Sequence, residues 1–281
     1  MSAISEHSVQ VRMPHFDLAS CSERHWLNGS AARTRFFDAL SLLLPAGERF
    51  FIDALRDRLP ALGGAPLANV RAFLGQEAWH SRVHATYNER LAAAGLPALR
   101  LAQFYSRRFA RARELLRADV QLAITVGGEH ITSILAAWLL ETPGVLDGAN
   151  AEYAALWRWH SAEEIEHKDV TATVHRALGG GYWLRTCGMF IATFTIVSGV
   201  VWNWLVLLRC DRALFSVRTW RDTVRLCFGA DRLLASTLPR YLAFFSPRFS
   251  GLSLSAKDRA LPTLQALLDQ GKLSLAPSKT R

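Results

Sequence analysis

Two short stretches of the chain repeat the same combination of acidic and imidazole side chains. FLGQEAWHSRVHATYN carries Glu77, His80 and His84, and WRWHSAEEIEHKDV carries His160, Glu164 and His167. On an α-helix, residues three apart are separated by about 60° and residues seven apart by about 20°, so each triplet forms one polar stripe. Such a stripe is costly to bury unless its charges are paired or bind a metal. The repeat therefore predicts two helices that present metal ligands to one another.

Two isolated glutamates complete this pattern. Glu48 lies in PAGERFF, before the first Glu-x-x-His pair, and Glu129 lies in TVGGEHITS, before the second. A four-helix bundle that binds two metals takes a Glu-x-x-His pair from each of two helices and a lone Glu from each of the other two. The order along the chain matches this requirement. We therefore expect an all-α fold built on a four-helix bundle with a di-metal site.

Proline and glycine clusters divide the chain into long segments that lack the alternation of strands. We expect helices at about 30–59, with a break or kink at Pro45, and at about 66–94, 100–140 and 150–177. The domains that follow are an N-terminal extension (1–29), the di-metal bundle (30–181), an apolar helix (182–210) and a basic helical tail (211–281).

The ligand types indicate which metal the site would take. Carboxylates can bridge two cations, and neutral imidazole completes each coordination sphere. A carboxylate and histidine set without thiolate suits two iron ions best, with manganese or zinc as alternatives. The four cysteines fall in no C-x-x-C pair, so neither a zinc–sulfur site nor a disulfide framework is indicated.

Three neighbouring glutamates compete for one ligand role. Glu164 precedes His167 by three residues, which makes it the expected metal ligand. Glu163 shares the same stripe and is our candidate for a catalytic or supporting carboxylate, whereas Glu166 should point away. The sequence alone does not separate the roles of Glu163 and Glu164 further.

His84 and His160 exceed the minimum ligand set. They could be additional metal ligands, proton shuttles or hydrogen-bond donors to the ligands. Glu48 also has a second interpretation, as a first-turn acid that interacts favourably with the helix dipole. Glu129 has small apolar neighbours in the sequence, which favour a buried metal ligand over an exposed, solvated side chain.

The motif blocks around these residues resemble those of a known family. PAGERFF, FLGQEAWHSRVHATYN, GGEHIT and WRWHSAEEIEHKDV look like the signature blocks of the bacterial predicted metal-dependent hydrolases, which are similar to ferritin-like di-iron carboxylate proteins. The resemblance runs from about residue 12 to 210. It implies a ferritin-like fold and metal-dependent activity, with motif positions at Glu48, Glu77, His80, His84, Glu129, His160, Glu164 and His167.

One segment is long enough to cross a bilayer. Residues 186–208 contain no charge and are flanked by Arg185 and Arg209. The open alternatives are contact with a membrane without crossing, a true span, and a buried or subunit-interface helix. A span would place the basic tail outside the cell, against the positive-inside tendency.

The positive charge of the chain lies mostly in its last quarter. The formal net charge is +9, and residues 209–281 hold 13 Lys/Arg against 5 Asp/Glu. No aromatic-interleaved binding motif accompanies these residues, so an anionic membrane surface is a better candidate partner than nucleic acid. A solvated helical surface without a partner is the open alternative. Residues 1–30 lack an apolar run of signal-peptide length. We expect a cytoplasmic protein, with the cytoplasmic face of the membrane as its place of contact.

Three functions are compatible with these features. The first is a di-iron enzyme that uses dioxygen to oxidise an apolar or lipid-like small molecule. The second is a two-metal hydrolase that activates water. The third is a metal-binding protein without turnover, although a basic tail and an apolar helix do not suit iron storage.

Overall fold

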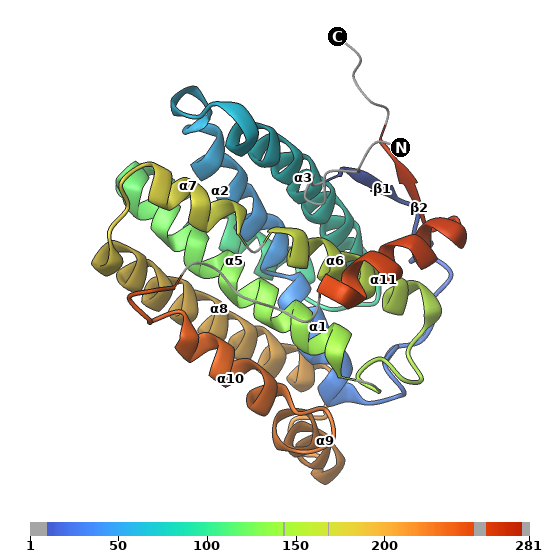
Figure 1. Ribbon diagram of the computed structural model, residues 1–281. Coiled ribbons are helices and arrows are strands. Elements are labelled where there is room, and N and C mark those ends of the chain that lie inside the picture. Colours follow the sequence, from blue (N-terminus) through green and yellow to red (C-terminus); the bar gives the residue numbers. More distant parts are fainter. Residues whose placement is uncertain (1–9, 143, 168, 250–256, 277–281) are drawn as a thin grey trace.

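The described chain is almost entirely helical, which confirms the prediction of an all-α fold (Figure 1). The computed structural model describes residues 10–142, 144–167, 169–249 and 257–276. Its elements are β1 (Arg12–Pro14), α1 (Ala31–Ser41), α2 (Leu44–Arg56), the 3₁₀ turn η1 (Leu59–Ala61), α3 (Gly64–Ala93), α4 (Ala98–Leu115), α5 (Ala118–Glu141), α6 (Ala151–His167), α7 (Val170–Ala177), α8 (Tyr182–Cys210), α9 (Val217–Phe228), α10 (Leu233–Ala243), α11 (Lys257–Asp269) and β2 (Leu273–Leu275).

Helices α2, α3, α5 and α6 form the bundle that carries the polar stripes. α2 packs on α3 and α5, and α6 packs on α5 and α3, so the four helices enclose a common interior. The break expected near Pro45 separates α1 from α2, and Pro45 lies in the first turn of α2. A proline is tolerated there because the first N–H groups of a helix have no intrahelical partner.

The segment 100–140 forms two helices, so the prediction of one continuous helix is wrong. Leu116 and Arg117 adopt extended backbone geometry between α4 and α5. The side-chain amide of Gln121 donates hydrogen bonds to the carbonyls of Arg113 and Leu116, which the end of α4 leaves unpaired. The break allows α4 to lie on the outside of α2 and α3 while α5 enters the bundle. The segment 150–177 likewise contains two helices, α6 and α7.

α8 packs closely along α5 and α1, and the α5 contact depends on glycine. A Cβ added at Gly188 would lie 2.3 Å from the carbonyl oxygen of Ala123, and one added at Gly127 would lie 2.8 Å from Cα of Met189. No side chain fits at either position without moving backbone. One side of the apolar helix α8 therefore packs against the bundle.

The two ends of the described chain meet beside the bundle. β1 pairs antiparallel with β2, with Arg12 opposite Leu275, and β1 also packs on α3. α11 packs on α6 (Figure 1). This arrangement brings Arg12 to the helices that carry the duplicated motif, 151 residues from Glu163 in the sequence.

Candidate metal centre

The four bundle helices place seven of the expected residues around one interior site. These residues are at most 5% exposed, although each side chain is a carboxyl group or an imidazole. α2 supplies Glu48, α3 supplies Glu77 and His80, α5 supplies Glu129, and α6 supplies His160, Glu164 and His167. The helical periodicity of the sequence explains why the residues on one helix share a face. Their convergence between helices is a property of the tertiary fold.

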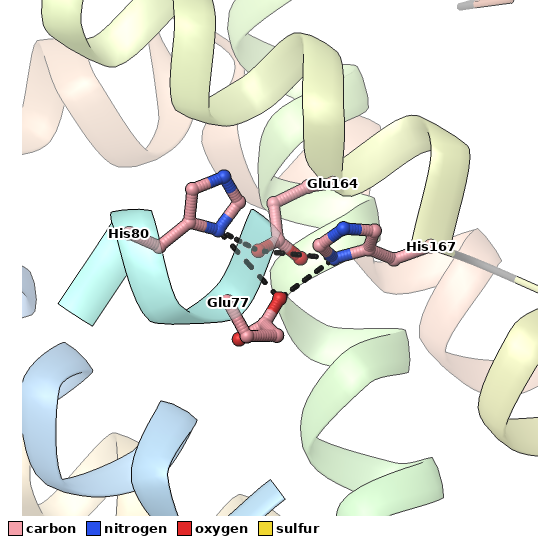
Figure 2. Close-up of side chains that lie close together, drawn as sticks. All are labelled: Glu77, His80, Glu164 and His167. Carbon is pink, nitrogen blue, oxygen red and sulfur yellow. Dashed lines mark ion pairs between the residues drawn. The ribbon is translucent and has the colours of Figure 1, made fainter. Parts of the chain in front are cut away.

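Figure 2 shows the most compact part of the site. Glu77, His80, Glu164 and His167 each offer one ligand atom, and these four atoms lie within 4.8 Å of one another. Nδ1 of His80 lies 3.6 Å from Glu77 and 3.5 Å from Glu164. Nδ1 of His167 lies 2.8 Å from Glu77 and 3.8 Å from Glu164. Glu129 approaches from α5, 3.7 Å from Nδ1 of His167.

A second group adjoins the first. Glu48, His80 and His160 also bring one ligand atom each within 4.8 Å of one another. Oε1 of Glu164 lies 3.5 Å from Nε2 of His160, as well as within 3.8 Å of Nδ1 of His80 and His167. This central oxygen faces all three imidazoles. A carboxylate in that position suits the space between two cations.

Several buried atoms of this site have no hydrogen-bond partner within the described part of the chain. They include both carboxylate oxygens of Glu48 and of Glu129, and Nδ1 of His80 and of His167. Buried polar atoms in folded proteins are nearly always paired, because leaving one unpaired costs about 1–3 kcal/mol. Several such atoms around one point form the donor set that a bound metal would satisfy.

The electrostatics of the carboxyl groups lead to the same conclusion. Burial raises the pKa of Glu48 well above its ordinary value, and the charge of Glu77 raises it further. Burial and the charge of Glu164 do the same to the pKa of Glu129. Burial alone would also raise the pKa of Glu77, but the adjacent His167 outweighs it and lowers this pKa to about 2. His80 lowers the pKa of Glu48 and of Glu129 but does not outweigh burial and the neighbouring carboxylates there, so a cation is needed to favour their charged forms.

Hydrogen bonds on the far side of each ring orient the two Glu-x-x-His histidines. Nε2 of His80 lies 3.0 Å from Oε2 of Glu163, whose other oxygen accepts from Arg12 at 3.1 Å. Nε2 of His167 lies 2.7 Å from the side-chain oxygen of Gln76. Carboxylate and amide oxygens only accept, so both Nε2 atoms donate. In the neutral rings that bind metal, both Nδ1 lone pairs therefore face the site.

His84 is held outside the two metal-ligand groups. Its Nε2 lies 3.3 Å from Nδ1 of His160, and its Nδ1 lies 3.0 Å from the hydroxyl of Ser41. Ser41 in turn donates to the side-chain oxygen of Asn88 at 2.9 Å. Because Ser41 uses its proton on Asn88, it accepts from His84. His84 therefore accepts from His160, and the Nε2 lone pair of His160 faces the carboxylates.

Burial also keeps these two histidines neutral. Desolvation lowers the pKa of His84 and of His160 well below the ordinary imidazole value, and the charge of His80 adds to this effect. A neutral imidazole is the form that binds metal. The structure thus places His160 at the site and His84 behind it as a hydrogen-bond acceptor.

Glu163 lies behind His80 and makes no direct approach to the carboxylate cluster. Both of its oxygens are engaged, one by Arg12 and the other by His80, and the side chain is fully buried. Glu166 is bound by Arg12 and Gln76 and makes no contact with the carboxylate cluster. This agrees with the expectation that Glu166 points away from the site.

An apolar cavity of about 60 Å³ adjoins the metal-ligand side chains. Its polar lining includes Glu48, Glu77, Glu164 and Thr132, and the hydroxyl of Thr132 donates to Glu164. The remaining wall is mainly aliphatic and aromatic, from α1, α2, α4, α5 and α8. A second apolar cavity reaches His160. The space beside the site therefore accommodates an apolar group better than a charged one.

Five residues that support the site were not among those predicted from the sequence. Gln76 lies four residues before His80 and Thr132 lies three residues after Glu129, so their helical positions could have suggested contact with the site. Asn88 follows His84 by four residues, which is again one turn. Arg12 and Ser41 carry no such signal, because they lie in other segments and reach the site only through tertiary packing.

Comparison with known proteins gives one match. A family model described as "Predicted metal-dependent hydrolase" matches residues 10–251, which confirms the resemblance inferred from the motif blocks. No curated protein and no solved structure matches the chain.

Proposed function

Since the chain belongs to the family of predicted metal-dependent hydrolases, we propose that it is a metal-dependent enzyme that holds two iron ions and oxidises an apolar organic substrate with dioxygen. The observation that carries this proposal is the interior donor set of four glutamates and three histidines, whose unpaired oxygens converge in an apolar enclosure. Carboxylate and imidazole ligands without thiolate suit iron, and a four-helix bundle of this pattern suits two ions.

The two ligand groups suggest how the ions would be shared. Glu77, Glu129 and His167 would hold one ion, and Glu48 and His160 would hold the other. His80 belongs to both ligand groups, and Oε1 of Glu164 lies within 3.8 Å of His80, His160 and His167, so both residues would help to hold the ions. Manganese and zinc are the alternative metals. When bound, ferrous ions would supply the electrons that activate dioxygen, and a reductant would restore them after each turnover.

The protein's own residues would prepare the site for this chemistry. Arg12 and Glu163 hold His80 in the orientation that directs Nδ1 inward, and Gln76 does the same for His167. We assign Glu163 this positioning role rather than contact with the substrate, because both of its oxygens are engaged. The apolar cavity would bind the hydrocarbon part of the substrate and exclude water.

Hydrolysis is the second candidate, and the family description favours it. Two metals can lower the pKa of bound water and hold both reacting oxygens of an ester or phosphate. Apart from the ligands, however, the adjoining cavity offers few polar groups to bind a polar leaving group. A substrate with a long apolar part would be required in either case.

Dependence on dioxygen separates the two reactions. The protein would be purified without oxygen, loaded with ferrous iron, and analysed for metal content and for optical change on addition of oxygen. We expect two ions per chain and rapid oxidation of both. Glu129→Gln should reduce loading and oxidation, whereas Glu89→Gln, at an exposed position on α3, should leave both unchanged.

The same preparations loaded with manganese or zinc would be incubated anaerobically with chromogenic acyl esters of increasing chain length. The protein would be a hydrolase rather than an oxidase if two results occur together. These are metal-dependent ester hydrolysis that Glu129→Gln abolishes, and no rapid oxidation of the iron-loaded form by oxygen. At most one ion per fully loaded chain would rule out the two-metal centre.

A further inference from the structure

The side of α8 that faces away from the bundle exposes a strip that is apolar except for Ser198. Its most exposed members are Trp183 and Phe194, which are 76% and 71% exposed. The strip runs along the helix at intervals of three, four and seven residues and contains Trp183, Cys187, Phe190, Ile191, Phe194, Val197, Ser198, Val201 and Trp202. It contains no charge over 20 residues, which corresponds to about 30 Å of helix.

A comparison with α5 shows that this strip is not explained by the core. Among the described residues, α5 and α8 are the two helices long and apolar enough to cross a membrane. In the most apolar 18-residue window of α5, 89% is buried inside the bundle, whereas in that of α8 the buried share is 28%. Burial in the core therefore accounts for the apolar residues of α5, whereas many apolar residues of α8 remain exposed.

Neighbouring helices extend the same surface. Phe245, just after α10, contacts Phe190 of α8 with 5.3 Å between ring centroids, and Trp220 of α9 contacts Trp204 of α8 at 5.7 Å. α8, α9 and α10 lie on the same side of the molecule (Figure 1). α10 exposes Leu234, Leu238 and Leu242, one on each turn, and the α9 region exposes Phe215, Val217, Trp220, Val224 and Phe228.

Arginines line the edge of this surface. Arg218, Arg221 and Arg225 are exposed and lie about one quarter of a helical turn from the exposed apolar residues of α9. Arg209 and Arg212 are exposed at the end of α8 and just after it. An apolar strip beside a row of arginines is typical of a helix that lies in the interface of a membrane.

The acidic residues of this region are turned inward. Residues 209–249 contain three acidic side chains, Asp211, Asp222 and Asp231, whose exposed fractions are 1%, 15% and 3%. Asp211 pairs with Arg35 at 2.6 Å, and Asp222 accepts from a serine hydroxyl at 2.7 Å. Asp231 pairs with Arg33 at 3.2 Å. Asp222 also lies 3.6 Å from Arg221 and 4.0 Å from Arg218, so it offsets part of their charge. Residues 209–249 hold eight arginines against these three aspartates, so the surface keeps a net positive charge.

We propose that the surface formed by α8, α9 and α10 lies flat on an anionic lipid bilayer, with the apolar strip in the interface and the arginines at the headgroups. A simple span by α8 is incompatible with this packing, because its other side is held against α5 through Gly188. A second copy of the chain is a poorer occupant, since a symmetric interface would bring arginine rows of the same charge together. The proposal does not depend on the chemistry of the metal centre.

Vesicle co-sedimentation of the full chain tests the proposal. Vesicles of phosphatidylcholine alone and of phosphatidylcholine with one quarter phosphatidylglycerol would be compared in 0.1 M and 1 M NaCl. We expect binding to the anionic vesicles, weakened but retained in 1 M NaCl because inserted apolar area resists salt. No binding to either vesicle would overturn the proposal.

Two paired variants separate the contributions. Phe194→Gln with Val201→Gln should abolish the salt-resistant binding. Arg218→Gln with Arg221→Gln should lower the partition coefficient for anionic vesicles about 30-fold and leave that for phosphatidylcholine unchanged. The matched control is Leu261→Gln, an exposed leucine on α11, which packs on α6.

Light scattering after gel filtration provides the second measurement. The wild type could be a dimer that does not bind vesicles, and the double variant Phe194→Gln, Val201→Gln could be a monomer. That result would show that a second copy of the chain covers the surface. A wild type that binds vesicles and variants that remain folded by circular dichroism but do not bind would support the bilayer.

Discussion

Glu129→Gln should change the stability of the metal-free and the metal-loaded protein in opposite directions. Glu129 is 1% exposed, and neither of its carboxylate oxygens has a hydrogen-bond partner in the described structure. The substitution keeps the shape of the side chain and removes its charge. Without metal, the variant no longer has a carboxylate that is costly to bury. With metal, it has lost a ligand.

The size of the effect follows from the raised pKa of Glu129. A carboxyl whose pKa is higher in the folded than in the unfolded protein favours folding below the unfolded value, and this contribution is lost as the pH rises through the folded value. Each pH unit between the unfolded and the folded pKa lowers the free energy of unfolding by about 1.36 kcal/mol. From an unfolded pKa of about 4.5 to pH 7, the upper bound is about 3.4 kcal/mol. We expect the metal-free variant to be about 1–3 kcal/mol more stable than the wild type at pH 7 and nearly equal to it at pH 4.

Urea unfolding at several pH values, with chelator or with saturating metal, measures both effects. In saturating metal the variant should be less stable than the wild type, because metal binding contributes to the free energy of folding. Glu89→Gln should change neither condition. Destabilisation of the metal-free protein by Glu129→Gln at pH 7 would refute the reasoning, since it would mean that the carboxylate stabilises the fold without a cation.

Three further substitutions test the arrangement around the site. His84→Ala should lower metal affinity about 10- to 100-fold, measured by competition with a chelator, while the metal spectrum keeps its shape, because His84 contacts a ligand and not the metal groups. Arg12→Met should lower the free energy of unfolding by about 3–5 kcal/mol in urea, since it leaves the buried Glu163 without its arginine partner. Gly188→Ala should lower the thermal midpoint by several degrees because its Cβ would clash with backbone, whereas Gly47→Ala, with open space around it, should not lower it.

The helices and the ligand stripes could be predicted from the sequence because both follow local geometry. A helix places residues three, four and seven apart on one face whatever surrounds it, so Glu77 and His80 had to be neighbours once α3 formed. The same rule identified Glu164 and His167. It failed at Leu116 and Arg117, where no proline or glycine marks the break between α4 and α5. There the packing of α4 outside the bundle overrides local helix propensity.

The roles of individual side chains were decided by tertiary packing. Sequence spacing treats His84 and His160 alike, but only His160 reaches the carboxylates, because His84 lies one turn further along α3 and binds Ser41. Arg12 reaches Glu163 across 151 residues of sequence, and no periodicity predicts such a contact.

The apolar segment 186–208 shows the same division. Its composition alone determined that it would be a long helix able to leave water. Whether it would be core, span or surface depended on what packed against it. Gly188 and Gly127 allow α8 to lie against α5 on one side, and the chain provides no cover for the Phe194 side within the described residues. Helical periodicity is a property of neighbouring residues, whereas burial, pairing and exposure depend on segments that only the folded chain brings together.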